Sequence, residues 1–221
     1  MKSRRNIVLM WIFSVVPAII LMFVYEKLPA QVPTSFGFNG TINAYGPRST
    51  MWMLAGLGPL MALMFQFLPR IDPKKQNYAK FQRYYDQFAI FMELFLLAVF
   101  GMVVMEILHP GTVSIGRMVT ALVSIMLILL GNMMGKIKHN YFFGIRTPWT
   151  LADPDVWVRT HALGGRIWFA LGSAMLPCSL LLPEQVFFVL LMAGLLGSTA
   201  LLAIVSYLWY RQRQRNQEGE Q

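Results

Sequence analysis

The side chains of this sequence that could bind a ligand gather in one stretch, from Gly131 to Arg166. It holds two of the three His residues and five of the 19 Lys and Arg residues. Near its middle Arg146 stands close to Trp149, and a guanidinium beside an indole can hold a carboxylate or a lipid phosphate through two hydrogen bonds. Arg146 could equally satisfy the free carbonyls at the end of the preceding helix. The sequence leaves both interpretations open.

The sequence contains no recognisable set of catalytic residues. His139, His161, Asp153 and Asp155 lie within the same stretch, but their spacing matches no standard metal-ligand motif. Asp153 and Asp155 are separated by one residue at a helix start. Their side chains therefore point in different directions, and they make a poor acid–base pair. We expect no catalytic residue, no metal ion and no cofactor, and we assign the two His to hydrogen bonds within the stretch.

Two carboxyl groups, those of Glu93 and Glu106, fall inside a long apolar run. A carboxyl group is costly in such a run and usually faces protein or water. One interpretation is a proton or ion path. The other is a neutral or paired carboxyl that joins helices, with Glu106 reaching toward the nearby membrane surface.

Local signals predict how the polar stretch folds. Gly144 and the Thr147-Pro148 step discourage a continuing helix, because proline favours extended geometry in the residue before it. A new helix then begins in one of two ways. Either Thr150 and Asp153 form a capping box, or Asp153 is the N-cap and Pro154 takes the first helical position.

The helix that begins there is predicted to cover about residues 154–163 and to end at Gly164-Gly165. On it we expect two pairs to share a face at a spacing of four residues: Asp155 with Arg159, and Trp157 with His161. A short helix with Trp on one side and charges on the other is typical of the membrane–water boundary.

The composition is that of an integral membrane protein, since 56% of the 221 residues are hydrophobic. Runs long enough to cross a bilayer core of ~30 Å predict six transmembrane helices, at about Ile7–Tyr25, Thr50–Leu68, Phe88–Leu108, Met118–Met134, Ile167–Leu182 and Val186–Tyr210. The single cysteine, Cys178, excludes a disulfide bond within the chain. We therefore expect an all-α integral membrane protein.

The distribution of Lys and Arg predicts the orientation. With the N-terminus in the cytoplasm, sixteen of the 19 basic residues fall in cytoplasmic segments, and Lys27, Arg48 and Arg117 fall outside. Basic residues usually stay on the inner side, so both termini and a structured loop between the fourth and fifth helices are predicted to be cytoplasmic. The net charge of +9 then reflects topology and anionic lipid headgroups, and we expect no direct binding of nucleic acid.

Three further segments carry predictions. In the outer loop, residues 26–49, the Asn39-Gly40 step is a turn signal that indicates a small hairpin or an ordered coil. Gly131 and Gly135 are spaced to permit close approach between helices. The Arg- and Gln-rich tail after Tyr210 is predicted to be disordered.

The polar stretch resembles the SdpI-type immunity protein family, bacterial membrane proteins that protect against a sporulation-delaying peptide toxin. The resemblance rests on Gly131-Asn132, Asn140, the GIRTPWTL run of residues 144–151, Asp153, Val156-Trp157, Thr160-His161 and Gly164-Gly165. Within this motif we take as candidate functional residues Asn132, Asn140, Gly144, Arg146, Thr147, Pro148, Trp149, Thr150, Asp153, Trp157 and His161.

The outer loop is similar, more weakly, to the amino-terminal domain of unknown function often found in this family. That match rests on Leu28-Pro29, Pro33 and Asn39-Gly40, while the family's His, Asp and Lys are replaced by Ser35, Asn43 and Arg48. These replacements argue against an ionisable or metal-linked role for the loop. The resemblance divides the chain into residues 1–68, a first helix pair with the loop 26–49, and residues 69–221, a four-helix region with the motif loop 131–166.

The resemblance implies a multi-pass protein of the cytoplasmic membrane that gives immunity to a secreted antimicrobial peptide toxin. It also implies sensing, with a transcriptional repressor held at the membrane. The partners would then be the toxin, a cytosolic repressor and membrane lipids. Two other functions remain open: a small ion-coupled transporter or exporter that uses Glu93 and Glu106, and a purely sensory protein that captures a soluble regulator.

Overall fold

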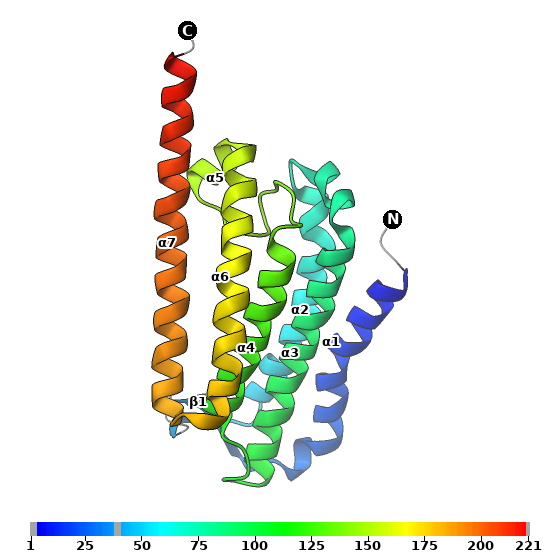
Figure 1. Ribbon diagram of the computed structural model, residues 1–221. Coiled ribbons are helices and arrows are strands. Elements are labelled where there is room, and N and C mark those ends of the chain that lie inside the picture. The colour runs from blue at the N-terminus through cyan, green and yellow to red at the C-terminus, as the bar shows by residue number, and fades with distance from the viewer. Residues whose placement is uncertain (1–3, 38–40, 220–221) are drawn as a thin grey trace.

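The computed structural model of this chain describes residues 4–37 and 41–219, which form a bundle of six long helices running side by side (Figure 1). The long helices are α1 (Arg4–Val24), α2 (Thr50–Ile71), α3 (Gln82–Leu108), α4 (Ile115–Met134), α6 (Pro154–Leu181) and α7 (Glu184–Gly219). Shorter elements connect them: the 3₁₀ turns Tyr25–Lys27 and Lys75–Lys80, the strands β1 (Gln31–Phe36) and β2 (Ile42–Pro47), and the short helix α5 (Pro148–Ala152). This mainly helical architecture agrees with the prediction.

Within the described residues, α1, α2, α3, α4 and α7 are long and apolar enough to cross a membrane. The outward surfaces of these helices are apolar, as on α1, where Val8, Ile12 and Ile19 are exposed. Such surfaces suit contact with lipid tails. Helix α6 contains most of the predicted fifth span, about Ile167–Leu182, but it is not one of the five. The count of six spans therefore stays a prediction.

The six helices pack in two groups of three. Helix α1 lies against α2 and α3, whereas α6 packs against both α4 and α7, and the contact of α3 with α4 joins the two groups. Buried side chains form one cluster that includes Tyr85 and Trp157 and a second that includes Val32 and Phe100.

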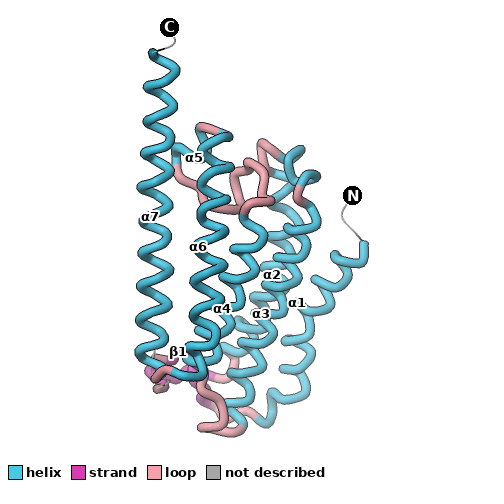
Figure 2. Tube along the Cα trace, in the orientation of Figure 1, coloured by secondary structure: helices cyan, strands magenta, loops and turns pink. Residues whose placement is uncertain are grey.

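The two ends of the bundle differ in what they carry (Figure 2). One end, which we call the loop end, carries the α2–α3 connector (residues 72–81), residues 135–153, the first turns of α1 and the last turns of α7. The other, the hairpin end, carries β1, β2 and residues 109–114. The basic segments predicted to share one side of a membrane thus lie at one end of the bundle. Which side of the membrane that end faces stays a prediction.

Within the outer loop, the strands β1 and β2 form a hairpin pair. Its strands pair antiparallel with Val32 opposite Gly46, and Val32 is fully buried in the cluster at the hairpin end. The hairpin prediction is thus confirmed, although the Asn39-Gly40 step that motivated it lies outside the described residues.

One predicted helix end is wrong. The helix that begins after Asp153 does not stop at Gly164-Gly165 but continues to Leu181. Gly165 lies where α6 crosses α4: a Cβ atom on Gly131 would stand 2.7 Å from the Gly165 carbonyl oxygen and 2.4 Å from the Phe169 amide nitrogen. Gly165 therefore serves the close approach of two helices and not the end of one.

The predicted disorder after Tyr210 is also wrong, because α7 continues to Gly219. Arg and Gln are good helix formers, and Arg213 makes ion pairs with Asp153 and Asp155 at the start of α6. A polar composition alone could not reveal that these partners lie within reach of the tail.

The contact of α4 with α6 can be tested with two alanine variants. Gly131→Ala should lower the free energy of unfolding by about 1–3 kcal/mol, since the new methyl group overlaps backbone atoms that cannot move independently of α6. Gly135→Ala is the matched control, because a Cβ atom there meets nothing within 4 Å. Unfolding of the purified protein in detergent measures both variants. Equal stability of Gly131→Ala and the unaltered protein would contradict the close approach.

Candidate functional site

At the loop end, the buried carboxylate of Asp72 joins two connectors that are far apart in the sequence. The side chain of Asp72 is 2% exposed. Its Oδ2 atom accepts hydrogen bonds from the Tyr78 hydroxyl at 3.0 Å and from the Tyr141 backbone N–H at 2.9 Å, and its Oδ1 atom accepts from the Lys74 backbone N–H at 2.7 Å. The α2–α3 connector and the segment after α4 therefore fold as one unit.

Asn140 organises the turn that follows α4. Its fully buried side chain accepts hydrogen bonds from the Phe142 and Phe143 backbone N–H groups at 3.0 and 2.6 Å, and it donates to the Lys138 and Phe143 carbonyls at 2.8 and 2.9 Å. The Tyr78 hydroxyl also reaches the Asn140 Oδ1 atom, at 3.3 Å. One amide side chain thus supplies the hydrogen bonds that a non-helical backbone lacks.

The hydroxyl of Tyr78 stays protonated in this environment. Burial, and then its hydrogen bond to the Asp72 carboxylate, raise the pKa of Tyr78 above the ordinary value of tyrosine. The group therefore acts as a hydrogen-bond donor between the two connectors.

Trp157 and His161 share one face of α6, as predicted, and their rings stack with centroids 3.9 Å apart. The Trp157 indole N–H donates to the Ile137 carbonyl at 3.0 Å. His161 Nδ1 donates to the Trp157 carbonyl at 2.8 Å, and His161 Nε2 accepts from the Ile145 N–H at 3.0 Å. Burial lowers the pKa of His161 to about 4, so the neutral ring bridges α6 and the loop at physiological pH.

Gly144 is required by the position of the His161 ring. Its φ angle is +115°, which side chains of L-residues rarely adopt, and a Cβ atom would stand 2.3 Å from His161 Nε2. The sequence predicted that Gly144 interrupts a helix and belongs to the motif, but it did not predict the contact with His161.

Two residues of the α2–α3 connector donate hydrogen bonds to His139. The Lys74 ammonium donates to His139 Nδ1 at 2.8 Å, and the Asn77 side-chain amide donates to the His139 carbonyl at 2.8 Å. Burial and the charge of Lys74 lower the pKa of His139. In the part of the chain that the structure describes, no three His, Cys, Asp or Glu side chains are placed to hold a metal ion.

Helix α5 starts with a capping box different from the predicted one. Thr147 caps the helix and exchanges hydrogen bonds with Thr150, whose N–H donates to Thr147 Oγ1 at 3.2 Å while Thr150 Oγ1 accepts from the Thr147 N–H at 2.9 Å. The predicted box of Thr150 with Asp153 is wrong because Pro148 lets α5 begin earlier. The other predicted start is confirmed: Asp153 caps α6, with Pro154 at its first position.

Helices α5 and α6 both contact the end of α7. The Trp149 indole N–H donates to the Ser206 hydroxyl, and the Trp149 ring lies edge-on to Tyr207, 5.3 Å away. Asp153 Oδ1 accepts from the backbone N–H groups that follow it, and its Oδ2 atom lies 2.7 Å from the Arg213 guanidinium.

Asp155 also pairs with Arg213, and among the described residues it makes no ion pair with Arg159. The predicted pair of Asp155 with Arg159 is therefore wrong. The competing partner comes from α7, whose extension the sequence did not predict.

Arg146 and Pro148 are exposed on the outer surface of this unit. Arg146 Nη1 donates to the Tyr141 carbonyl at 2.8 Å, so this guanidinium stabilises the loop and not the end of α4. The rest of the side chain lies open to solvent, where it could meet a carboxylate or phosphate.

Ten of the eleven predicted site residues lie in this unit of the loop end: Asn140, Gly144, Arg146, Thr147, Pro148, Trp149, Thr150, Asp153, Trp157 and His161. Asn132 is separate, because it is exposed on α4 and lines a groove with Arg166 and Phe169. Whether these residues carry function stays a prediction.

Glu93 and Glu106 differ in their surroundings. Glu106 accepts hydrogen bonds from the Gly111 and Val113 N–H groups at 2.9 and 3.2 Å and so fixes the α3–α4 connector. Glu93 is 1% exposed, and neither of its oxygens has a hydrogen-bond partner among the described residues. Thirteen residues apart on one helix, the two groups lie roughly 20 Å from each other.

Sequence reasoning missed the residues that hold the loop from outside the motif, among them Asp72, Tyr78, Ser206 and Arg213. In the sequence, the α2–α3 connector is distinguished mainly by its positive charge. The signal that could have found Asp72 is the Asp72-Pro73 step directly after a long apolar run, where an acidic side chain is placed to cap a turn.

Comparison with known proteins confirms the predicted resemblance. Residues 136–209 match the model of the SdpI/YfhL protein family, and residues 12–58 match that of a domain of unknown function, DUF1648. Over 211 residues, which make up 96% of this chain and 97% of the relative, the chain is 24% identical to the Immunity protein SdpI of Bacillus subtilis (strain 168). No solved structure matches the chain significantly. The apolar helices and this relationship describe a multi-pass membrane protein.

The contact of Gly144 with His161 leads to a matched pair of variants. Gly144→Ala should lower the free energy of unfolding by about 1–3 kcal/mol more than Gly111→Ala, since it also separates His161 from the Ile145 N–H and leaves buried polar groups without partners. Gly111 has a φ angle of +81° with nothing within 4 Å of a Cβ atom, so it reports backbone strain alone. Unfolding in detergent measures the difference. Equal losses for the two variants would contradict the bridging role of His161.

Proposed function

We propose that this protein is an immunity protein of the bacterial cytoplasmic membrane that protects its cell from a secreted antimicrobial peptide, because residues 136–209 match the model of the SdpI/YfhL protein family. The observation that carries the proposal is the likeness to a protein named for immunity over 96% of the chain. The role that we propose is binding and not catalysis, with no cofactor.

We propose that α6 crosses the membrane together with the five apolar helices, which gives six transmembrane helices. We also propose that the loop end faces the cytoplasm. Two observations support this topology. The loop end gathers the basic segments that the sequence assigns to the inner side. Helix α6 packs between neighbours that are apolar enough to span, α4 and α7. The hairpin end would then face outward, where a secreted peptide arrives.

A groove at the hairpin end fits this assignment. It has a volume of about 520 Å³ and lies between the hairpin, α3, α4 and the start of α7, with Phe36, Val103 and Val119 among its walls. Its size is that of a small-molecule site, and its walls are mainly apolar. In the proposed function, an apolar segment of the toxin enters here.

The loop end supplies the surface that we assign to a cytosolic partner. Tyr141, Arg146 and Pro148 are exposed on it, while the residues beneath them are fixed by buried hydrogen bonds. A rigid, basic and aromatic surface of this kind suits protein recognition. We also propose that this surface holds a transcriptional repressor at the membrane, as the resemblance implies. The proposal keeps the two parts of the chain given above, residues 1–68 and residues 69–221.

A second candidate function, ion-coupled transport, is favoured by Glu93. A carboxyl group without a partner in a membrane-spanning helix is costly and often marks an ion or proton path. Glu106, however, is already bound to two backbone N–H groups. The transport candidate therefore depends on Glu93 alone.

Toxin challenge of a sensitive bacterium tests the proposal. Cells carrying the unaltered chain should tolerate several-fold more toxin than cells without it. Arg146→Ala should reduce this tolerance because, in the proposed function, protection requires the partner surface of the loop end as well as the groove at the hairpin end. Trp149→Ala should do the same by releasing α5 from Ser206. Arg159→Ala is the matched control, since Arg159 is exposed and makes no ion pair among the described residues.

Immunoblotting of the membrane fraction must show equal amounts of each variant. Absence of protection by the unaltered chain would overturn the immunity assignment. Loss of protection in Glu93→Gln, with Arg146→Ala and Trp149→Ala fully active, would instead favour the transport candidate.

A further inference from the structure

A second groove lies at the loop end, on the far side of the bundle from α7. It runs between the first turns of α1 and α3, with a volume of about 610 Å³, and its walls include Arg5, Asn6 and Leu9 from α1 and Arg83, Asp86 and Ile90 from α3. It shares no residue with the unit built around Asp72 and Asn140. The proposed immunity function gives it no role.

Two guanidiniums in this groove have no protein partner. Arg5 and Arg83 are exposed, and in the described ranges 4–37 and 41–219 neither makes an ion pair or a side-chain hydrogen bond. Two unpaired arginines that line one groove favour a ligand that carries negative charge, and phosphate matches the planar arrangement of their donors.

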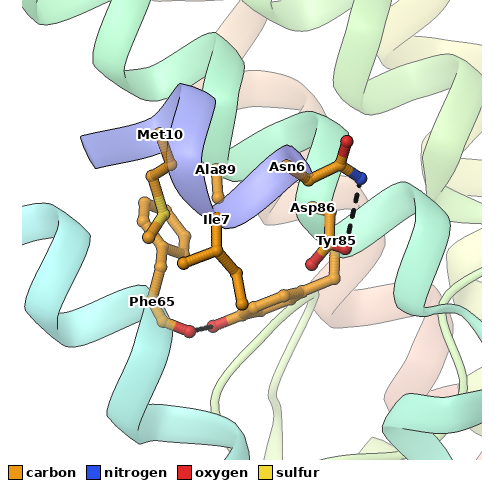
Figure 3. A pocket seen from close by; sticks show the side chains of 7 residues that line it. All are labelled: Asn6, Ile7, Met10, Phe65, Tyr85, Asp86 and Ala89. Carbon is orange, nitrogen blue, oxygen red and sulfur yellow. Dashed lines mark hydrogen bonds between the residues drawn. The ribbon is translucent and has the colours of Figure 1, made fainter. Parts of the chain in front are cut away.

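The carboxylate in the groove, Asp86, is already engaged. Its Oδ1 atom accepts from the Gln82 side-chain amide at 2.5 Å and its Oδ2 atom from the Asn6 side-chain amide at 3.3 Å, and the residue is 7% exposed. Figure 3 shows the Asn6–Asp86 hydrogen bond linking α1 to α3. Asp86 therefore stabilises the wall, and the arginines set the charge that the groove presents.

The groove is closed toward the interior of the bundle. The pocket drawn in Figure 3 lies next to it and shares Asn6 and Asp86, but Ile7, Met10 and Phe65 fill it to about 10 Å³, which is room for at most a single water molecule. A ligand of the groove must therefore stay on the outer surface of the helices, where lipid molecules lie.

The polarity of the groove changes along the helices. Both α1 and α3 start at the loop end and run in the same direction (Figure 1). From Arg5 to Leu9 the chain advances ~6 Å toward the middle of the bundle, and from Arg83 to Ile90 it advances ~10 Å. Positive charge at the membrane surface followed by apolar side chains at greater depth matches a phospholipid, with its phosphate above its acyl chains.

We propose that this groove binds one anionic phospholipid, with the phosphate between Arg5 and Arg83 and an acyl chain along Leu9 and Ile90. The site ties the first helix to the third through a lipid. Its existence does not depend on the immunity function, nor on which face of the membrane the loop end occupies.

The test uses the full chain in detergent, incubated with equal amounts of phosphatidylglycerol and phosphatidylcholine of the same acyl chains. Native mass spectrometry should show the unaltered protein retaining several-fold more phosphatidylglycerol. The double variant Arg5→Gln/Arg83→Gln should bind both lipids about equally. The matched control is Arg211→Gln/Arg215→Gln, which removes the same charge from exposed arginines of α7 and should keep the preference.

Helical content and unfolding of the double variant should be unchanged, since neither arginine has a partner to lose. If the double variant does not fold, Arg83→Gln alone should reduce the preference by a smaller factor. No preference in the unaltered protein, or an equal loss in the α7 control, would overturn the site. Excess inorganic phosphate should not displace the lipid; displacement by it would assign the groove to free phosphate and overturn the lipid proposal.

Discussion

The loop end depends on one buried carboxylate. Asp72 accepts hydrogen bonds from its own connector, through the Lys74 N–H and the Tyr78 hydroxyl, and from the Tyr141 N–H, 69 residues later in the chain. An acceptor this deeply buried is stable only while its donors stay in place, and each donor left unpaired costs about 1–3 kcal/mol. The two connectors therefore order each other, and neither has an equivalent set of partners by itself.

The other contacts extend from this junction. Asn140 shapes the turn next to Tyr141, and Trp157 and His161 fix that turn to α6. At the start of α6, the ion pairs of Arg213 with Asp153 and Asp155 connect the unit to α7. In the connector after α4, side chains accept hydrogen bonds from five backbone N–H groups, those of Tyr141, Phe142, Phe143, Ile145 and Thr147. The result is a rigid surface on which exposed side chains hold fixed positions.

The sequence predicted what depends on neighbouring residues. Apolar runs located the long helices. The predicted start of α2 at Thr50 and the predicted ends of α3 at Leu108 and of α4 at Met134 agree with the structure. The Asp153-Pro154 step located the start of α6. Ten of the eleven motif residues proved to lie together. Their neighbours could not be predicted, because Asp72 and Arg213 come from distant segments and no local pattern reveals a partner that only folding brings near.

The same reasoning explains the errors. Gly164-Gly165 is a normal helix end in isolation, but α4 passes so close to Gly165 that a glycine is needed inside the helix. The polar tail after Tyr210 contains nothing to bury, but Asp153 and Asp155 stand where Arg213 can reach them. Tertiary contacts reversed both local signals, as they commonly do where propensities are weak.

Hydrogen–deuterium exchange in Asp72→Ala measures most directly whether this carboxylate orders the loop end. Backbone amides of residues 138–147 should exchange on the order of tenfold faster than in the unaltered protein, while those of α4 and α6 stay protected. Asp155→Ala, which removes an exposed carboxylate of the same end, should leave the segment unchanged. Exchange around Tyr141 that is as slow in Asp72→Ala as in the unaltered protein would contradict the dependence of the loop on Asp72.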